Sequence, residues 1–252
     1  MSQDPNHLAR LISITSQALP GFVGRIGPVN ANQLLCGSVE NPARIASLHG
    51  HWQQAHPEAG PHYWSTRSWT LLIWQPVYLS LLAVHLANRA PCLAQMGQSV
   101  ESGFVGGFCL PEHCPHKGAE ETLIRFAAEQ INDFTEQQLN EFNSVSSIYP
   151  KLARLLVADC VRAALLLVQR QQGLSNAQLR GVERSWMEAL GLPGASALIE
   201  VCLDDGRACL ALSRKACCQH FRRSDGEPCS SCPKLKQDER LRRLRQELLL
   251  VC

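Results

Sequence analysis

Four cysteines near the end of the chain have the types and spacing of a metal site. The motif begins with the vicinal pair Cys217 and Cys218. Ten residues later comes the pair Cys229 and Cys232, whose members are separated by two residues. Thiolates are soft, negatively charged ligands that suit either Zn²⁺ or an iron–sulfur cluster. The Cys-x2-Cys spacing of the closing pair is common to both kinds of site.

The vicinal pair helps to separate these two alternatives. Adjacent side chains in a strand point to opposite faces, so Cys217 and Cys218 can both be ligands only if the backbone turns there. A mononuclear zinc site usually spaces its cysteines by about two to four residues. A two-iron cluster is larger and offers ligand positions that lie farther apart. The spacing therefore favours a cluster over zinc.

With Pro233 after the closing pair, the motif resembles that of the FhuF-type ferric-siderophore reductases. The likeness is looser elsewhere, in an apolar segment that contains Trp and Pro and in the Gly-Phe-Val-Gly-Gly-Phe segment at 103–108. The resemblance implies a 2Fe–2S cluster held by the four cysteines. It also implies one-electron reduction of Fe³⁺ bound to a siderophore of the hydroxamate type, with release of Fe²⁺. A ferredoxin or a flavoprotein reductase would supply the electron.

Composition limits the class of protein. The 252 residues are 45% hydrophobic and 18% charged, which predicts a folded core. A net charge of +2 is too small to indicate nucleic-acid binding. The polar first ten residues lack the apolar run of a signal peptide, and the chain has twelve cysteines. We therefore expect a cytoplasmic protein with reduced thiols.

A run of nineteen residues at 69–87 contains no Asp, Glu, Lys or Arg. That length could span a bilayer. Four polar or helix-breaking residues interrupt it, namely Gln75, Pro76, Ser80 and His85. We therefore predict a helix buried in the protein core, and a peripheral contact with the cytoplasmic face of the inner membrane stays open.

The same segment offers the best candidates for a siderophore pocket. Siderophore oxygens around iron are hard acceptors, so hydrogen-bond donors and flat aromatic faces are the expected lining. The candidates are Arg67, Trp69, Trp74, Gln75, Tyr78 and His85. The alternative for the aromatic residues is that they pack in the core.

The periodicity predicts an α+β fold whose parts form one integrated domain. A mainly helical body spans 1–195, and a β-hairpin, the cluster loop and a basic helix follow at 196–252. Helices are expected at 4–19, 41–56, 69–87, 117–145, 151–171, 175–190 and 237–251.

The hairpin is expected to turn at Asp205-Gly206, a strong signal for a two-residue turn. In that register 204 pairs with 207 and Cys202 lies across from Cys209. One apolar face would then combine Ile199, Val201, Leu203, Ala208, Leu210 and Leu212. The second strand leads into the vicinal cysteines, so the hairpin would present the cluster loop.

The last helix carries Arg240, Arg242, Arg243 and Arg245. It could dock an acidic electron donor, or it could simply seal the core.

Apart from the reductase, the sequence leaves a second function open: a structural zinc loop with four cysteine ligands, whose basic tail binds a protein or nucleic acid without redox activity. No Ser/His/Asp or paired-carboxylate site is evident.

Overall fold

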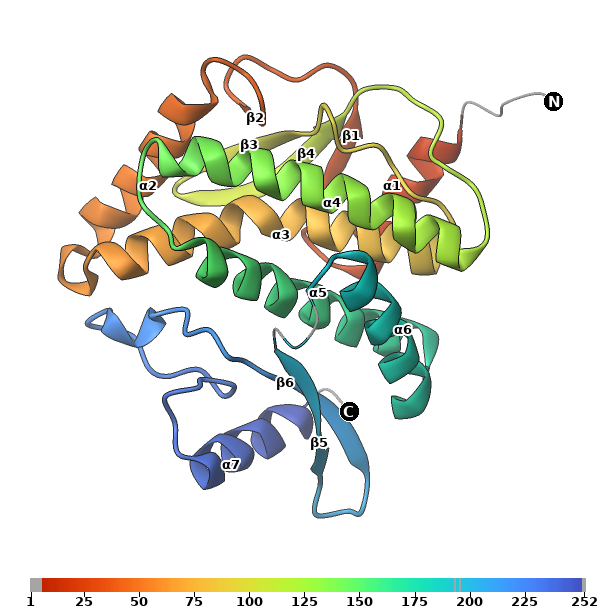
Figure 1. Cartoon of the computed structure of the whole chain (residues 1–252), viewed down its shortest axis with the longest axis vertical. Helices are drawn as coiled ribbons and strands as arrows, with labels where there is room; N and C mark the ends of the chain where they lie inside the picture. Colours follow the sequence, from red (N-terminus) through yellow and green to blue (C-terminus); the bar gives the residue numbers. More distant parts are fainter. Residues whose placement is uncertain (1–5, 193, 195, 251–252) are drawn as a thin grey trace.

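The computed structural model describes residues 6–192, 194 and 196–250, and it confirms the α+β fold (Figure 1). The helical body consists of α1 (His7–Ala18), α2 (Asn41–Ala55), α3 (Pro61–Ala87), α4 (Glu120–Asn143), α5 (Pro150–Gln172) and α6 (Asn176–Ala189). These helices lie within a few residues of the expected bounds, except that α3 begins earlier, at Pro61. The expected helix residues 4, 5 and 251 lie outside the described part of the chain.

Helix α3 is the centre of the body, and α1, α2, α4 and α5 pack against it. By length and composition it could cross a membrane, but 72% of its most apolar window is buried inside the protein. Leu72, Ile73 and Val77 are fully buried. Gly60, with φ 78°, precedes the helix, and Asn88 ends it in the left-handed conformation. The prediction of a buried core helix is confirmed.

A small sheet covers one side of α3. Its strand order is β1 (Gly24–Ile26), β4 (Phe104–Leu110), β3 (Gly97–Glu101) and β2 (Leu34–Leu35). The indole of Trp74 on α3 donates to the carbonyl of Val105 on β4 at 2.8 Å. This bond ties the sheet to the part of α3 that also faces the C-terminal region.

The C-terminal region starts with the hairpin of β5 (Ala197–Cys202) and β6 (Ala208–Ser213). Its observed register differs by one residue from the predicted register. Val201 pairs with Cys209 and Cys202 pairs with Ala208. The reason is the turn: Leu203 N–H donates to Arg207 O at 2.8 Å, which leaves a three-residue loop that ends at Gly206 with φ 83°.

This register gives the hairpin two buried faces instead of one. Leu198 and Leu210 join the core of the helical body. Val201, Leu203 and Ala211 pack against Leu244 and Leu248 of α7 (Gln237–Leu248), and these five residues form a separate small core. The hairpin therefore packs against the helical body with some of its side chains and against α7 with others. Figure 1 shows α7 beside the hairpin, below the helical body.

Candidate metal centre

The cluster loop begins where β6 leaves the hairpin. Ala216, the residue before the vicinal cysteines, is buried in the core of the body. Gln219, directly after them, adopts the left-handed conformation with φ 60° and starts the short η2 helix (His220–Arg222). The backbone therefore turns at the vicinal pair, which is the condition for both thiols to become ligands.

The four thiols lie in two pairs. The Sγ atoms of Cys217 and Cys232 are 4.0 Å apart, and Cys229 hydrogen-bonds to Cys218. Each pair thus joins one member of the vicinal pair to one member of the closing pair. Within the described ranges, no three His, Cys, Asp or Glu side chains are grouped so as to hold a single metal ion. Two thiol pairs fit a cluster of two irons better than one tetrahedral zinc.

The thiols differ in acidity. The hydrogen bond between Cys229 and Cys218 is the main reason that the pKa of Cys218 is lowered and that of Cys229 is raised, and the backbone N–H of His220 and the charge of Arg214 also lower the pKa of Cys218. Burial raises the pKa of Cys217 to about 11. Cys218 and Cys229 therefore act as one pair that shares a proton, and this pair supplies a first thiolate more readily than Cys217 does.

The loop returns through a tight turn at Gly226. Its N–H donates to Arg223 O at 3.0 Å. A Cβ atom at this position would lie 2.2 Å from the backbone oxygen of His220. Only glycine fits here without movement of the backbone that carries the first pair of cysteines.

Contacts with two different parts of the protein hold the loop. On the side of the body, Ser224 N–H donates to Glu58 of the η1 turn (Pro57–Ala59) at 3.0 Å, and the ring of His220 packs near that of Tyr63. On the side of α7, Arg243 donates to the carbonyl of Pro228 at 2.7 Å. The residues next to both cysteine pairs are thus fixed from both flanks.

The arginines of α7 are largely engaged in hydrogen bonds to neighbouring groups of the protein. Arg242 and Arg243 donate to Glu239 at 2.7 and 2.6 Å, and Arg245 donates to the carbonyl of Cys202 at 3.1 Å. The helix therefore carries less free positive charge than its sequence suggests, and its apolar side seals the hairpin.

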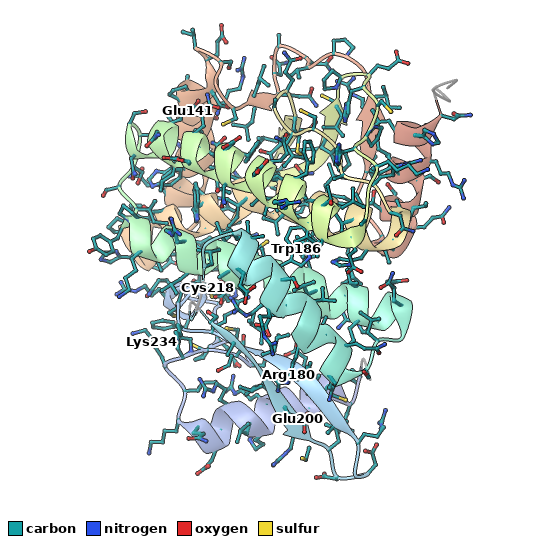
Figure 2. The ribbon with its side chains drawn as sticks, turned by 45° about the vertical axis from the view of Figure 1, so that its right-hand side comes forward. Glu141, Arg180, Trp186, Glu200, Cys218 and Lys234 are labelled. Carbon is teal, nitrogen blue, oxygen red and sulfur yellow. The ribbon has the colours of Figure 1, made fainter. Side chains whose placement is uncertain are left out.

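A cavity of about 340 Å³ lies where the loop meets α3 and α5. Cys218 and Cys229 form part of its wall, whereas Cys232 is 1% exposed and lies outside it. Figure 2 shows Cys218 at this junction between the body and the C-terminal hairpin. The full lining is Tyr63, Arg67, Thr70, Leu71, Ile73, Trp74, Tyr78, Leu156, Asp159, Cys160, Ala163, Arg214, Cys218, His220 and Cys229.

Three of the six pocket candidates line this cavity: Arg67, Trp74 and Tyr78. They follow one face of α3 at helical spacing, together with Tyr63 and Thr70. The guanidinium of Arg67 lies over the ring of Trp52, at 4.7 Å. Their role in binding a ligand stays a prediction.

The other three candidates lie away from this cavity, because they are on other faces of the helix. Trp69 is buried and donates to Ala153 O at 3.2 Å. Gln75 is buried and accepts a hydrogen bond from Gln98 of β3 at 3.1 Å. His85 accepts a hydrogen bond from the indole of Trp186 at 2.8 Å. Their placement in a pocket beside the cysteines is therefore corrected.

The buried position of His85 predicts a stability loss in acid. Burial lowers its pKa to about 4, whereas its ordinary value is 6.5. The unfolded chain therefore binds a proton between these values that the folded protein does not, and stability falls as the pH drops from 6.5 towards 4. The loss should reach about 3 kcal/mol. Urea unfolding at pH 7 and pH 4.5 measures it.

A His85→Gln variant should have a flatter dependence on pH in this range, because the glutamine oxygen can accept from Trp186 without titrating. His62→Gln, at an exposed position, is the matched control and should behave like the parent protein. Identical pH dependence of the parent and the His85 variant would contradict the prediction.

Sequence reasoning missed Tyr63 and Asp159 as residues of the cavity. Asp159 is 3% exposed, and burial raises its pKa to about 6 although Ser196 donates to its Oδ1 at 2.5 Å. Its signal was a lone carboxylate within the strongly apolar stretch of α5. Tyr63 could have been found by extending the spacing of 67, 74 and 78 by one turn towards the N-terminus.

Comparison with known protein families identifies the loop. Residues 214–234 match the FhuF 2Fe-2S C-terminal domain, and this stretch contains all four cysteines. The segment is therefore a FhuF-type 2Fe–2S domain, and a 2Fe–2S cluster is its cofactor. The resemblance found in the motif and the choice of a cluster over zinc are both confirmed. The four cysteines are the thiols in this segment that can hold the irons.

Proposed function

From the FhuF-type 2Fe–2S domain at residues 214–234, we propose that the chain is a ferric-siderophore reductase. When bound, the cluster supplies single electrons. The substrate is Fe³⁺ held by the hard oxygen donors of a siderophore, of the hydroxamate type. One electron converts it to Fe²⁺, a softer ion that these oxygens hold far more weakly. Reduction therefore releases the iron.

The observation that carries this proposal is the composition of the cavity wall. Cys218 and Cys229 share one cavity with Trp74, Tyr78 and Arg67. A ligand in this space is next to two of the proposed cluster ligands, so an electron has only a short distance to cross. The chemistry requires no nucleophile or acid–base pair, because no covalent bond to the protein is formed.

The residues of the cavity have distinct tasks in this proposal. The rings of Trp74 and Tyr78, with centroids 6.0 Å apart, provide an apolar wall for the organic part of the siderophore. Arg67 and Arg214 provide positive charge for the iron-bound oxygens. The four cysteines, in their two pairs, would hold the redox centre beside the cavity.

We place this reaction in the cytoplasm, where a ferredoxin or a flavoprotein reductase would return the electron. Reduced thiols are stable in that compartment. A peripheral contact with the inner membrane would bring the protein close to arriving siderophores. Cell fractionation tests the location, and recovery of the native protein outside the cytoplasm and its membrane face would overturn it.

An anaerobic single-turnover assay tests the function. The purified protein is reduced with dithionite, freed of the reductant and mixed with a ferric trihydroxamate in the presence of a ferrous-specific chelator. We expect Fe²⁺ in stoichiometric amount to the cluster, together with return of the oxidised absorption spectrum. Stoichiometric zinc in the isolated protein, or no release of Fe²⁺ from the reduced protein, would overturn the proposal.

Trp74→Ala should weaken binding of the siderophore by roughly tenfold, because a stacked aromatic contact contributes about 0.5–1.5 kcal/mol beyond its buried area. The absorption spectrum of the cluster should not change. Fluorescence titration with a gallium trihydroxamate measures the affinity without electron transfer. Trp69→Phe, in the core, is the matched control and should keep the parent affinity. Unaltered binding by Trp74→Ala would remove α3 from the pocket.

A further inference from the structure

Four buried polar atoms around the cavity have no hydrogen-bond partner in the described protein: Oη of Tyr63, Nε of Arg67, Nε of Arg214 and Oδ2 of Asp159. Arg214 Nε and Asp159 Oδ2 form a long ion pair at 3.9 Å. This distance is too long for a hydrogen bond. Buried polar groups are nearly always satisfied, so four such atoms around one cavity indicate a ligand that supplies their partners.

The two arginines come from different parts of the chain. Arg67 lies on α3, and its guanidinium group packs over the ring of Trp52. Arg214 directly follows β6 and lies three residues before Cys217. Guanidinium groups are planar donors that match pairs of adjacent anionic oxygens. Two of them at one cavity favour a ligand with a flat, bidentate pair of negatively charged oxygens.

The size of the cavity limits how much of a ferric complex can enter. Its volume of about 340 Å³ is at the lower end of the range for small-molecule sites. A ferric siderophore surrounds the ion with three bidentate arms, and such a complex does not fit whole in this space. One arm fits, with its oxygens between the arginines and its carbon chain along Trp74 and Tyr78.

We propose that Arg67 and Arg214 clamp a single chelating arm of the ferric complex, a planar hydroxamate-type group, while the other two arms stay outside the cavity. This rests on the proposed function and deepens it. The protein then selects the chelating group and not the backbone of the siderophore. Asp159 offers its second oxygen to an amide N–H of the same arm. Phe104 extends the aromatic wall outside the cavity, because its side chain is 49% exposed and its ring lies 6.0 Å from that of Trp74.

Binding of gallium complexes to the cluster-loaded protein tests the clamp. Ga³⁺ has the charge and nearly the size of Fe³⁺ but accepts no electron, so affinity is measured apart from reduction. Calorimetry with the gallium complex of a linear trihydroxamate should show at least about tenfold weaker binding for Arg67→Gln and for Arg214→Gln. Arg125→Gln, at an exposed position on α4, is the control and should bind like the parent protein.

A second titration tests the single arm. The gallium complex of three separate monohydroxamate molecules should compete for the site with an affinity within about tenfold of the linear complex, because only one arm is clamped. Failure to compete would overturn the single-arm mode. If Arg214→Gln loses the cluster spectrum, Arg214→Lys and Arg67→Gln provide the comparison, and we expect weaker binding for both.

The outcomes separate the clamp from the function. Parent affinity in both arginine variants, with normal release of Fe²⁺, would overturn the clamp and leave the reductase standing. A second outcome is tight binding of gallium complexes that depends on the arginines, without any release of Fe²⁺ from the ferric complex. It would overturn the reductase and leave a binding site for anionic oxygen ligands.

Discussion

Replacing Cys218 by serine should remove most of the cluster from the protein. Cys218 forms a hydrogen-bonded pair with Cys229, and it lies in the cavity wall. A serine hydroxyl at this position remains protonated at neutral pH and is a poor, hard ligand for cluster iron. We expect iron and acid-labile sulfide to drop to less than about one fifth of the parent content, with loss of visible absorption.

Cys114→Ser is the matched control, because Cys114 is an exposed free thiol outside the motif. It should keep the iron content and the spectrum of the parent protein. Helical circular dichroism should be retained in both variants, since the core of the body does not include the thiol of Cys218. Full metal content in Cys218→Ser would show that the vicinal cysteines are not a ligand pair.

A second large effect is expected from Gly226→Ala, a change of one methyl group. The added Cβ would lie 2.2 Å from the His220 oxygen, which is a backbone atom and cannot rotate away. The turn must open, and the closing cysteines then move relative to Cys217 and Cys218. We expect the iron content to fall by more than about half, because ligand geometry must be held closely for a cluster to assemble. Iron analysis after anaerobic reconstitution measures this.

Gly181→Ala provides the control. Gly181 lies inside α6, and nothing is within 4 Å of a Cβ placed there. Alanine should stabilise the helix by up to about 1 kcal/mol and leave the iron content unchanged. If Gly226→Ala assembles a normal cluster, the turn is more adaptable than its packing indicates.

Features set by local sequence were the ones that could be predicted. The spacing of the cysteines led to the cluster, and the uncharged run of α3 with its few polar residues led to a core helix. Ser175 directly precedes α6 and forms a capping box with Gln178, three residues along the chain. In each case residues close together in the chain decide the outcome.

Features set by packing between distant segments were not predicted correctly. The predicted hairpin register was wrong because Asp204 is part of the turn. Both faces of the hairpin carry apolar residues, so the pattern of hydrophobic residues does not distinguish the two registers. Of the six pocket candidates, three line the cavity beside the cysteines and three do not, because apolar and aromatic residues surround α3 on every side. Only contacts with α5 and the cluster loop reveal which face meets the cavity. Division of the chain at 195/196 stays a prediction.

The position of the hairpin between two cores has a consequence for how the holoprotein is made. The body core and the small α7 core both consist of apolar side chains and need no metal to form. We therefore expect the polypeptide to fold before it receives iron and sulfide, unlike zinc fingers, which are unfolded without metal. Biogenesis would then end with delivery of the cofactor to a finished scaffold, and a damaged centre could be rebuilt in place without synthesis of a new chain.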